Sequence, residues 1–365
     1  TEAHPATEMQ PVEPEQEPEP APEAKTYPHA EEDDATRTLD LEVYSEGVLL
    51  IDAQTNTVVA EKNPDARIYP ASMTKVMTAL VACEKIENWD DTFTMTQEII
   101  DPLYLADASL AGFVNGEKVP MLDLVYGAIL PSGAEATEAL AIYVAGSEAA
   151  YAELMNEKAA ELGLKDTHFV DASGLHDENH YTTARDMAII ARAAMQNETF
   201  RDIAACTSYA MPKDNIYRSR KIENRNKFLN KAETRAYYAD GTGIKTGTTS
   251  AAGNCFVGSA KRDGVSLISV VLGATDDIAR YTDTQRLNYG FSQYVSTSIA
   301  EIYAQNPRTV DIRSFALDDP EVGRLTLNLR KVDAKASDAI VTTKSQVDYW
   351  VQNLYSVTVT EFTRE

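Results

Sequence analysis

The sequence predicts an α+β fold in which both ends of one large domain contribute strands to a single antiparallel sheet. Three observations support this prediction. Short apolar runs occur before residue 61, helical periodicity dominates between Met73 and Met195, and alternating β-branched segments follow Gly253. Strands that are distant in the chain then share one layer, and we expect helices on both faces of the sheet.

Residues 1–40 differ in composition from the rest of the chain. Thr, Glu, Pro and Ala dominate this segment, and aliphatic residues are nearly absent. Such a segment cannot bury enough apolar surface to offset its ordering entropy, so we predict a disordered acidic spacer. The sequence has neither an initiator Met nor an apolar targeting segment, and we expect a targeting peptide to have been removed.

The first folded elements are a hairpin and a helix. Two apolar runs, Gly47–Asp52 and Asn56–Ala60, flank a polar turn and predict the hairpin. Apolar residues at helical spacing predict a helix over Met73–Ile86, and Pro70 and Ser72 are typical of its start. Further helices with apolar faces are predicted over 136–145, 147–162 and 183–195.

Strand signals return in the last third of the chain. Cys255–Ser259 and Leu267–Leu272 predict two strands, and a closing amphipathic helix is expected over about Ile278–Tyr294. Beyond it the segments 309–312, 324–329 and 357–360 alternate as strands do. We therefore predict a main domain over 41–295 and a small β-rich domain over 296–365.

Charge and cysteine content exclude some classes of partner and site. The net charge of −24 argues against nucleic acid, because neutralising phosphates requires clustered Lys and Arg. Cys83, Cys206 and Cys255 lie at long, irregular intervals without metal-ligand spacing, and we interpret them as small buried residues. One disulfide is compatible with an oxidising compartment but is not required by the sequence, and we expect no metal and no cofactor.

One short motif combines a nucleophile with a base. Ser72-Met73-Thr74-Lys75 begins the predicted helix, so Ser72 and Lys75 lie one turn apart on one face, and Lys75 can reach the Ser72 hydroxyl. Alone this is weak evidence, because S-x-x-K should occur about once by chance in such a chain.

Two further segments are ambiguous when taken singly. Lys245-Thr246-Gly247 lies among glycines and small residues, where a substrate backbone could approach an edge strand and Lys245 could attract an anionic end; the alternative is a polar turn. Ser132 lies at a loop-to-helix junction, where it could simply cap the helix.

In the order S-x-x-K, S-G-x, K-T-G, the three segments match the signature of penicillin-binding proteins and class A β-lactamases. From about Leu50 to Phe291 the chain resembles the D-alanyl-D-alanine carboxypeptidases among the low-molecular-mass penicillin-binding proteins. The resemblance also rests on the segments 69–75, 130–133, 183–187, 224–227, 243–247 and 259–264.

The resemblance implies a role for each motif residue. Ser72 would attack the carbonyl carbon between the two terminal D-alanines of a peptidoglycan stem peptide, with Lys75 as its base and Ser132 as proton relay to the leaving amine. Lys75 needs a lowered pKa, which we expect from burial and from the like charge of Lys245.

The remaining roles concern binding. Main-chain N–H groups of Ser72 and Thr248 would form the oxyanion hole. The substrate-binding residues would be Lys245, Thr246, Gly247 and Arg280, with the terminal carboxylate held by Lys245, Thr246 and, from family spacing, Arg280. A solvated arginine at a helix start is the alternative for Arg280.

The resemblance also implies a β-lactamase/DD-peptidase-like fold and an extracytoplasmic location. The expected partners are a stem peptide ending in D-Ala-D-Ala and β-lactam antibiotics as covalent inhibitors. Membrane anchoring through a segment outside the given chain is typical of the family.

Three alternative functions are compatible with parts of the sequence. A β-lactamase shares the motifs but needs a glutamate-bound water that nothing here convincingly supplies. Ala134 replaces the asparagine of the usual S-x-N motif, which is the best argument for a cell-wall-binding or penicillin-binding protein with weak turnover. His176 and His180, at the spacing of two metal ligands, raise the possibility of a metal peptidase, although a third ligand is not obvious and a surface loop is the simpler interpretation.

Overall fold

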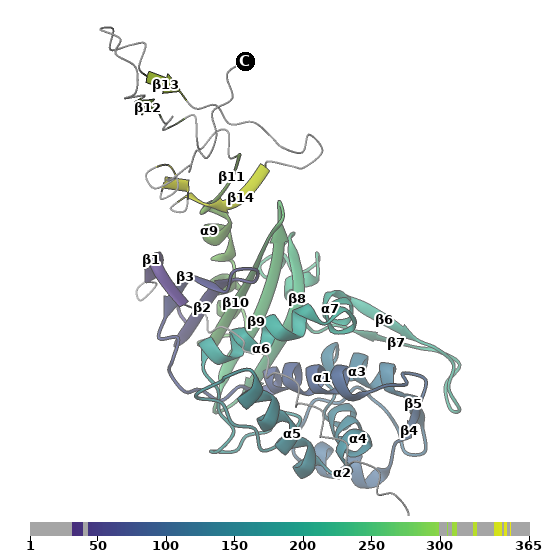
Figure 1. Ribbon diagram of the computed structural model, residues 1–365. Helices are drawn as coiled ribbons and strands as arrows, with labels where there is room; N and C mark the ends of the chain where they lie inside the picture. Colours follow the sequence, from purple (N-terminus) through teal and green to yellow (C-terminus); the bar gives the residue numbers. More distant parts are fainter. Residues whose placement is uncertain are drawn as a thin grey trace, which may run out of the picture.

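The computed structural model describes residues 31–38 and 43–298, followed by 305, 309–311, 324–326, 339–344, 347–348 and 351. At its centre is a six-stranded sheet (Figure 1). In spatial order its strands are β1 (Glu31–Thr38), β3 (Thr57–Lys62), β2 (Gly47–Asp52), β10 (Val265–Ala274), β9 (Gly253–Arg262) and β8 (Gly241–Thr249). Strands from both ends of the main domain therefore share one sheet, as the sequence predicts.

Five of the six strands pair antiparallel, and one pairing departs from the prediction. β2 and β3 form the expected hairpin, and β2 joins the C-terminal strands by pairing with β10. β1, by contrast, runs parallel to β3, which makes the sheet mixed.

Strand β1 also corrects the prediction for the N-terminal segment. Glu31–Thr38 falls inside the expected spacer, yet it pairs with β3, and the Thr36 hydroxyl donates to the Val58 carbonyl at 2.7 Å. The acidic composition of the segment did not predict this strand, because an edge strand is held mainly by backbone hydrogen bonds and often carries charged side chains. The remainder of 1–40 lies outside the described residues.

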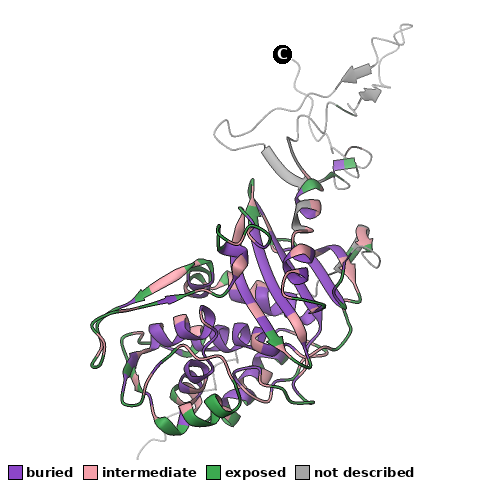
Figure 2. Ribbon diagram, turned by 180° about the vertical axis from the view of Figure 1, so that it is seen from behind, coloured by how far each residue is buried: buried purple, intermediate pink, exposed green. Residues whose placement is uncertain are grey.

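Both faces of the sheet are buried, because successive side chains on a strand point to opposite faces (Figure 2). On β2, Leu49 and Ile51 belong to the larger core, while Val48 and Leu50 belong to a second core on the other face. The larger core lies under the helical insertion, and the second lies under the closing helices.

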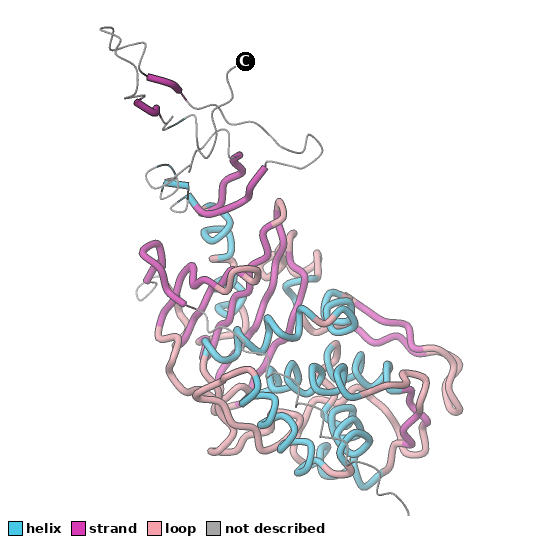
Figure 3. The backbone as a smooth tube through the Cα atoms, viewed as in Figure 1, coloured by secondary structure: helices cyan, strands magenta, loops and turns pink. Residues whose placement is uncertain are grey.

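The helical insertion separates β3 from β8 (Figure 3). Its helices are η1 (Ala71–Met73), α1 (Thr74–Lys85), α2 (Gln97–Leu105), α3 (Met121–Ile129), α4 (Ala134–Ala145), α5 (Glu148–Glu161), α6 (Ala184–Gln196), α7 (Glu198–Ala205) and η2 (Lys227–Leu229). Two hairpins accompany them, β4 (Thr92–Thr94) with β5 (Lys118–Pro120) and β6 (Ser208–Met211) with β7 (Arg220–Glu223). The predicted helices are confirmed to within a few residues; Thr183, for example, caps α6 by accepting from the Asp186 N–H.

The closing helix is divided in two. α8 (Ala279–Thr284) and α9 (Leu287–Ser292) replace the single helix expected over Ile278–Tyr294. α9 packs closely on the sheet at Gly290, where an added Cβ would lie 2.7 Å from Leu267.

The C-terminal segment contains short strand pairs. β11 (Tyr294–Ser298) pairs with β14 (Ala339–Thr343), and β12 (Thr309–Asp311) pairs with β13 (Arg324–Thr326), near two of the predicted strands. The third, 357–360, lies outside the described residues, and the domain boundary at residue 295 stays a prediction. Within the described part of the chain, the three cysteines are free and no helix is both long and apolar enough to cross a membrane.

Candidate active site

Ser72 lies in a tight turn that leads into α1. The turn forms because the Met73 N–H donates to the Pro70 carbonyl at 3.2 Å, and Ala71 takes a positive φ of 48°. Ser72 does not cap α1 with its hydroxyl. Instead the Lys75 Nζ, one turn later, donates to the Ser72 Oγ at 3.1 Å. The predicted proximity of nucleophile and base is therefore present.

Lys75 is held by a second contact that the sequence does not indicate. Its Nζ donates to the Ser173 carbonyl at 2.6 Å, and the residue is only 2% exposed. Burial lowers the Lys75 pKa to about 8, although the nearby carboxylates of Asp171, Glu135 and Glu148 act to raise it. A useful fraction of Lys75 is therefore neutral near physiological pH.

Lys245-Thr246-Gly247 lies within the edge strand β8. The free side of β8 faces the Ser72 turn, and the approach is close. A Cβ on Gly247 would lie 2.8 Å from the Pro70 carbonyl oxygen and 3.1 Å from the Ser72 amide nitrogen. Only glycine fits there, which rules out the interpretation of this motif as a plain polar turn.

Lys245 is buried beside the other cations of the site. The residue is 2% exposed, and its Nζ donates to the Thr246 carbonyl at 3.1 Å. Burial lowers its pKa well below the ordinary value, and the charges of Lys75, Arg225 and Arg280 lower it further. The expected repulsion between the two lysines therefore lowers the pKa of Lys245, whereas the pKa of Lys75 is lowered by burial and by Arg225.

Ser132 does not cap the helix that follows it. Gly133 occupies the cap position of α4 without a side-chain hydrogen bond, and Ser132 has a positive φ of 70° at 5% exposure. Two backbone hydrogen bonds hold this strained turn, from Gly133 to the Gly127 carbonyl and from Ala134 to the Ser109 carbonyl. In the described structure Ser132 makes no hydrogen bond with Ser72 or Lys75, so its role as a relay stays a prediction.

Glu135, next to this turn, is structural. Its Oε1 accepts from the backbone N–H groups of Ala111, Gly112 and Phe113, at 2.7, 2.8 and 3.3 Å. The side chain thus fixes a loop beside the site and does not act on Ser72.

Arg280 is buried, so the alternative of a solvated arginine is wrong. Its guanidinium donates to the Thr248 hydroxyl at 3.0 Å and to the Gly247 carbonyl at 3.2 Å, and it forms an ion pair with Asp277. Asp277 also binds the Lys227 Nζ at 2.7 Å. Arg280 therefore lies beneath the K-T-G segment, where an anionic substrate end is expected.

These elements surround a cleft of about 600 Å³. Ser72, Lys75, Ala134 and Thr248 line it together with the segments 106–109, 173–176 and 249–251. Ser132, Lys245 and Arg280 are buried and are not among the residues that line it. Ala134 faces the cleft where the usual asparagine would add an amide.

Arg225 is a residue of the site that sequence reasoning did not select. Its guanidinium donates to the Ser109 hydroxyl at 2.7 Å, and its charge lowers the pKa of both Lys75 and Lys245. The segment 224–227, quoted above for its resemblance, was the only available signal.

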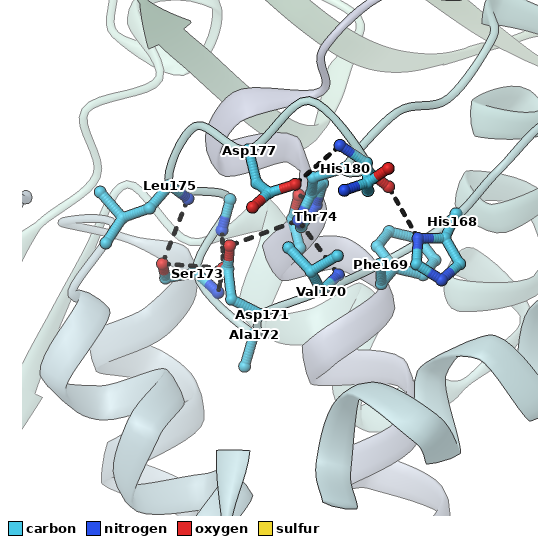
Figure 4. Close-up of polar contacts among 12 residues, drawn as sticks. Thr74, His168, Phe169, Val170, Asp171, Ala172, Ser173, Leu175, Asp177 and His180 are labelled. Atoms are coloured by element: carbon cyan, nitrogen blue, oxygen red, sulfur yellow. Dashed lines mark hydrogen bonds and ion pairs between the residues drawn. The ribbon is translucent and has the colours of Figure 1, made fainter. Parts of the chain in front are cut away.

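The two histidines considered as metal ligands do not converge. The His176 ring packs edge-on against Tyr69 at 4.6 Å, whereas His180 is buried and binds Thr74 and Asp171 (Figure 4). The interpretation of a simple surface loop is also wrong for His180. Among the described residues, no group of three or more His, Cys, Asp or Glu could hold a metal ion.

Comparison with known proteins agrees with this geometry. Residues 33–276 match the family described as D-alanyl-D-alanine carboxypeptidase. The chain belongs to this family. It is 32% identical to DacF of Bacillus subtilis over 72% of this chain and 66% of that protein, and 35% identical to DacC of Escherichia coli over 67% and 60%. The chain thus spans about two thirds or less of these two relatives.

Solved structures of family members have the same fold. The Streptomyces K15 DD-transpeptidase superimposes with a TM-score of 0.64 at 31% identity, covering 69% of this chain and 99% of that one. DacD of Francisella tularensis gives a TM-score of 0.65 at 27% identity, covering 87% and 85%. The β-lactamase/DD-peptidase-like fold implied by the motifs is therefore confirmed.

Proposed function

We propose that this chain is a serine-type D-alanyl-D-alanine carboxypeptidase that acts through an acyl-enzyme on Ser72. One observation carries the proposal: the Ser72 Oγ lies 3.1 Å from the Nζ of a buried lysine whose pKa is lowered to about 8. About a tenth of such a lysine is neutral at pH 7, against about one in 3,000 at the ordinary pKa. Lys75 can therefore serve as a general base.

In the first half-reaction, neutral Lys75 takes the hydroxyl proton as Ser72 Oγ attacks the carbonyl carbon between the two terminal D-alanines. The N–H groups of Ser72 and Thr248 stabilise the oxyanion of the tetrahedral intermediate. The C–N bond then breaks, and Ser132 passes the proton to the amine, which leaves as D-alanine. Water hydrolyses the ester in the second half-reaction and restores Ser72.

The substrate is held by its anionic end. Lys245 and Thr246 bind the terminal carboxylate, with Arg280 close behind Thr248. Gly247 lets the substrate and the Ser72 turn approach β8 closely. Ala134 leaves this side of the cleft without the amide of the S-x-N motif, so we expect turnover to be preserved at a changed rate.

The substrate class follows from this chemistry and from the family. We infer that the chain acts outside the cytoplasm on peptidoglycan stem peptides ending in D-Ala-D-Ala, and that β-lactams acylate the same serine. We also propose residues 1–30 as an acidic spacer, 41–295 together with β1 as the catalytic domain and 296–365 as a small separate domain.

A fluorescent penicillin, intact mass and release of D-alanine from a diacyl-Lys-D-Ala-D-Ala peptide test the proposal. Labelling that is lost in Ser72→Ala, with D-alanine release that persists in a chelator, is the expected result. Labelling without release would support the penicillin-binding protein with weak turnover. Absence of labelling would refute the serine mechanism, and sensitivity to the chelator would favour a metal peptidase.

Transfer to an amine is a second candidate for the fate of the acyl-enzyme. The Streptomyces K15 neighbour, which the chain matches over 99% of that structure, is named a DD-transpeptidase. Adding an acceptor such as glycylglycine to the peptide assay separates the two, because transfer yields a longer peptide and hydrolysis does not.

A further inference from the structure

The position of the Lys75 ammonium depends on a carbonyl group contributed by another part of the chain. Lys75 Nζ lies 2.6 Å from the Ser173 carbonyl oxygen but 3.1 Å from Ser72 Oγ. The carbonyl is therefore its stronger partner. Ser173 belongs to the loop between α5 and α6, so the geometry of this loop determines where the proposed base sits.

Asp171 shapes that loop from within (Figure 4). Its Oδ1 accepts from the Ser173 N–H and the Gly174 N–H, both at 2.6 Å, and from the Ser173 hydroxyl at 3.0 Å. Gly174 packs directly on the turn that carries Ser72: an added Cβ would lie only 1.9 Å from the Ala71 carbonyl oxygen. The turn that receives the ammonium is thus fixed by one carboxylate.

His180 joins this turn to the helix that carries the base. Its Nδ1 lies 3.3 Å from Asp171 Oδ2, and its Nε2 lies 2.8 Å from the Thr74 hydroxyl, one residue before Lys75. The ring is 2% exposed and packs edge-on against Phe169. Thr74 and His180 are 106 residues apart in the chain, so this contact connects two separate elements across the site.

The Asp171 carboxylate, which connects His180 with the Ser173 turn, stays ionised near neutral pH. Burial alone would raise the Asp171 pKa, but His180 and the N–H groups of the turn lower it below the ordinary value. The charged groups that act on Lys75 are Asp171, Glu135, Glu148 and Arg225. Of these, Asp171 accepts from the Ser173 and Gly174 N–H groups of the turn that binds the ammonium, and Glu148 accepts from the Ala172 N–H at 3.2 Å.

We propose that Asp171 and His180 are a pair of positioning residues for the reaction, which together hold the Ser173 carbonyl against the Lys75 ammonium and keep that ammonium in reach of Ser72. This inference rests on the proposed function. It assigns a role to the His180 side chain that replaces the metal-ligand interpretation.

The test measures the second-order rate of Ser72 acylation by a fluorescent penicillin across a pH series. Asp171→Ala and His180→Ala should slow acylation by about 10- to 100-fold, because a misplacement of about 1 Å at a reacting group can cost 100-fold. Asp171→Asn keeps the acceptor for the turn but removes the charge. Since Asp171 raises the Lys75 pKa, this variant should move the rising limb of the pH profile to lower pH while the rate at high pH changes little.

Two variants separate positioning from a merely structural role. Thr74→Val removes the hydroxyl at the other end of the link and should reproduce the His180→Ala defect, and the double variant should be no slower than either single one. His168→Ala is the matched control, because His168 lies in the same loop and is exposed, and its ring contacts the Asn179 carbonyl and Tyr181 but no residue of the Asp171–His180–Thr74 link. It should acylate as the wild type does.

The outcomes are distinguishable from those of the proposed function. If the wild-type chain is not labelled at all, the serine mechanism itself fails. If the wild type is labelled and Asp171→Asn, Thr74→Val and His180→Ala match it in rate and pH profile, the positioning role is overturned. If the alanine variants unfold, the thermal melts will show it, and the acylation rate of Thr74→Val decides the question.

Discussion

Replacing Gly247 with alanine tests how closely β8 must approach the turn that carries Ser72. The added Cβ would lie 2.8 Å from the Pro70 carbonyl oxygen and 3.1 Å from the backbone nitrogens of Ser72 and Met73. Real Cβ atoms essentially never lie within 3.0 Å of such atoms, and all three contacts are backbone, so neither side can yield by rotating a side chain. The strand and the turn must separate by several tenths of an ångström.

The change should affect activity more than stability. Overpacking of this kind costs about 1–3 kcal/mol of unfolding free energy. The separation also displaces the Ser72 N–H from the Thr248 segment, and we expect acylation by penicillin to fall by about 100-fold. Urea unfolding and the rate of fluorescent penicillin labelling measure the two effects on the same protein.

Gly264→Ala is the matched control. Gly264 has a positive φ of 86° in the β9–β10 turn, and no atom lies within 4 Å of an added Cβ. Alanine there should cost about 1–2 kcal/mol through backbone strain and leave acylation unchanged. If Gly247→Ala labels Ser72 at the rate of this control, the close approach of β8 is not what assembles the site.

Three further predictions concern single side chains. The acylation rate should rise with pH along a limb centred near pH 8, because the Lys75 pKa is lowered to about 8 and only the neutral amine accepts the serine proton. A limb near the ordinary lysine pKa would contradict this. Arg280→Ala should lower kcat/KM for a D-Ala-D-Ala peptide by about 10- to 100-fold, because a hydrogen bond between charged groups is worth about 1.5–3 kcal/mol. The same variant should barely affect a peptide whose terminal carboxylate is amidated. An equal loss on both peptides would argue against carboxylate binding. Glu135→Ala should lower the unfolding free energy by about 3 kcal/mol or more in urea titrations, since three backbone N–H groups lose their acceptor. A change below about 1 kcal/mol would show that these N–H groups find other partners.

What the sequence predicted well depends on local periodicity. Ser72 and Lys75 meet because three residues make one helical turn, whatever the rest of the chain does. The strands β2 and β10 were found for a similar reason, since uninterrupted apolar runs require burial on both faces. Strand β1 was missed because its pairing depends on an available edge of β3 and not on its own composition.

The parts of the site that were missed depend on contacts between distant segments. The left-handed turn at Ser132 exists because Ser109 and Gly127 hold the residues that follow it, and no local pattern indicates that. The spacing of His176 and His180 is equally compatible with a metal site. Only the fold, by bringing Thr74 beside His180, decides between the two.

The two buried lysines differ in the charges around them, and this difference is consistent with the proposed anionic substrate. Lys75 has the carboxylates of Asp171, Glu135 and Glu148 around it, and they keep its pKa near 8 despite full burial. Lys245 is equally buried, but the charges that act on it are all positive, and its pKa lies well below the ordinary value. A terminal carboxylate is the anion that this second lysine lacks. Its binding would raise the pKa of Lys245 toward the ordinary value, so recognition of the carboxylate and the electrostatic balance of the cleft depend on the same group.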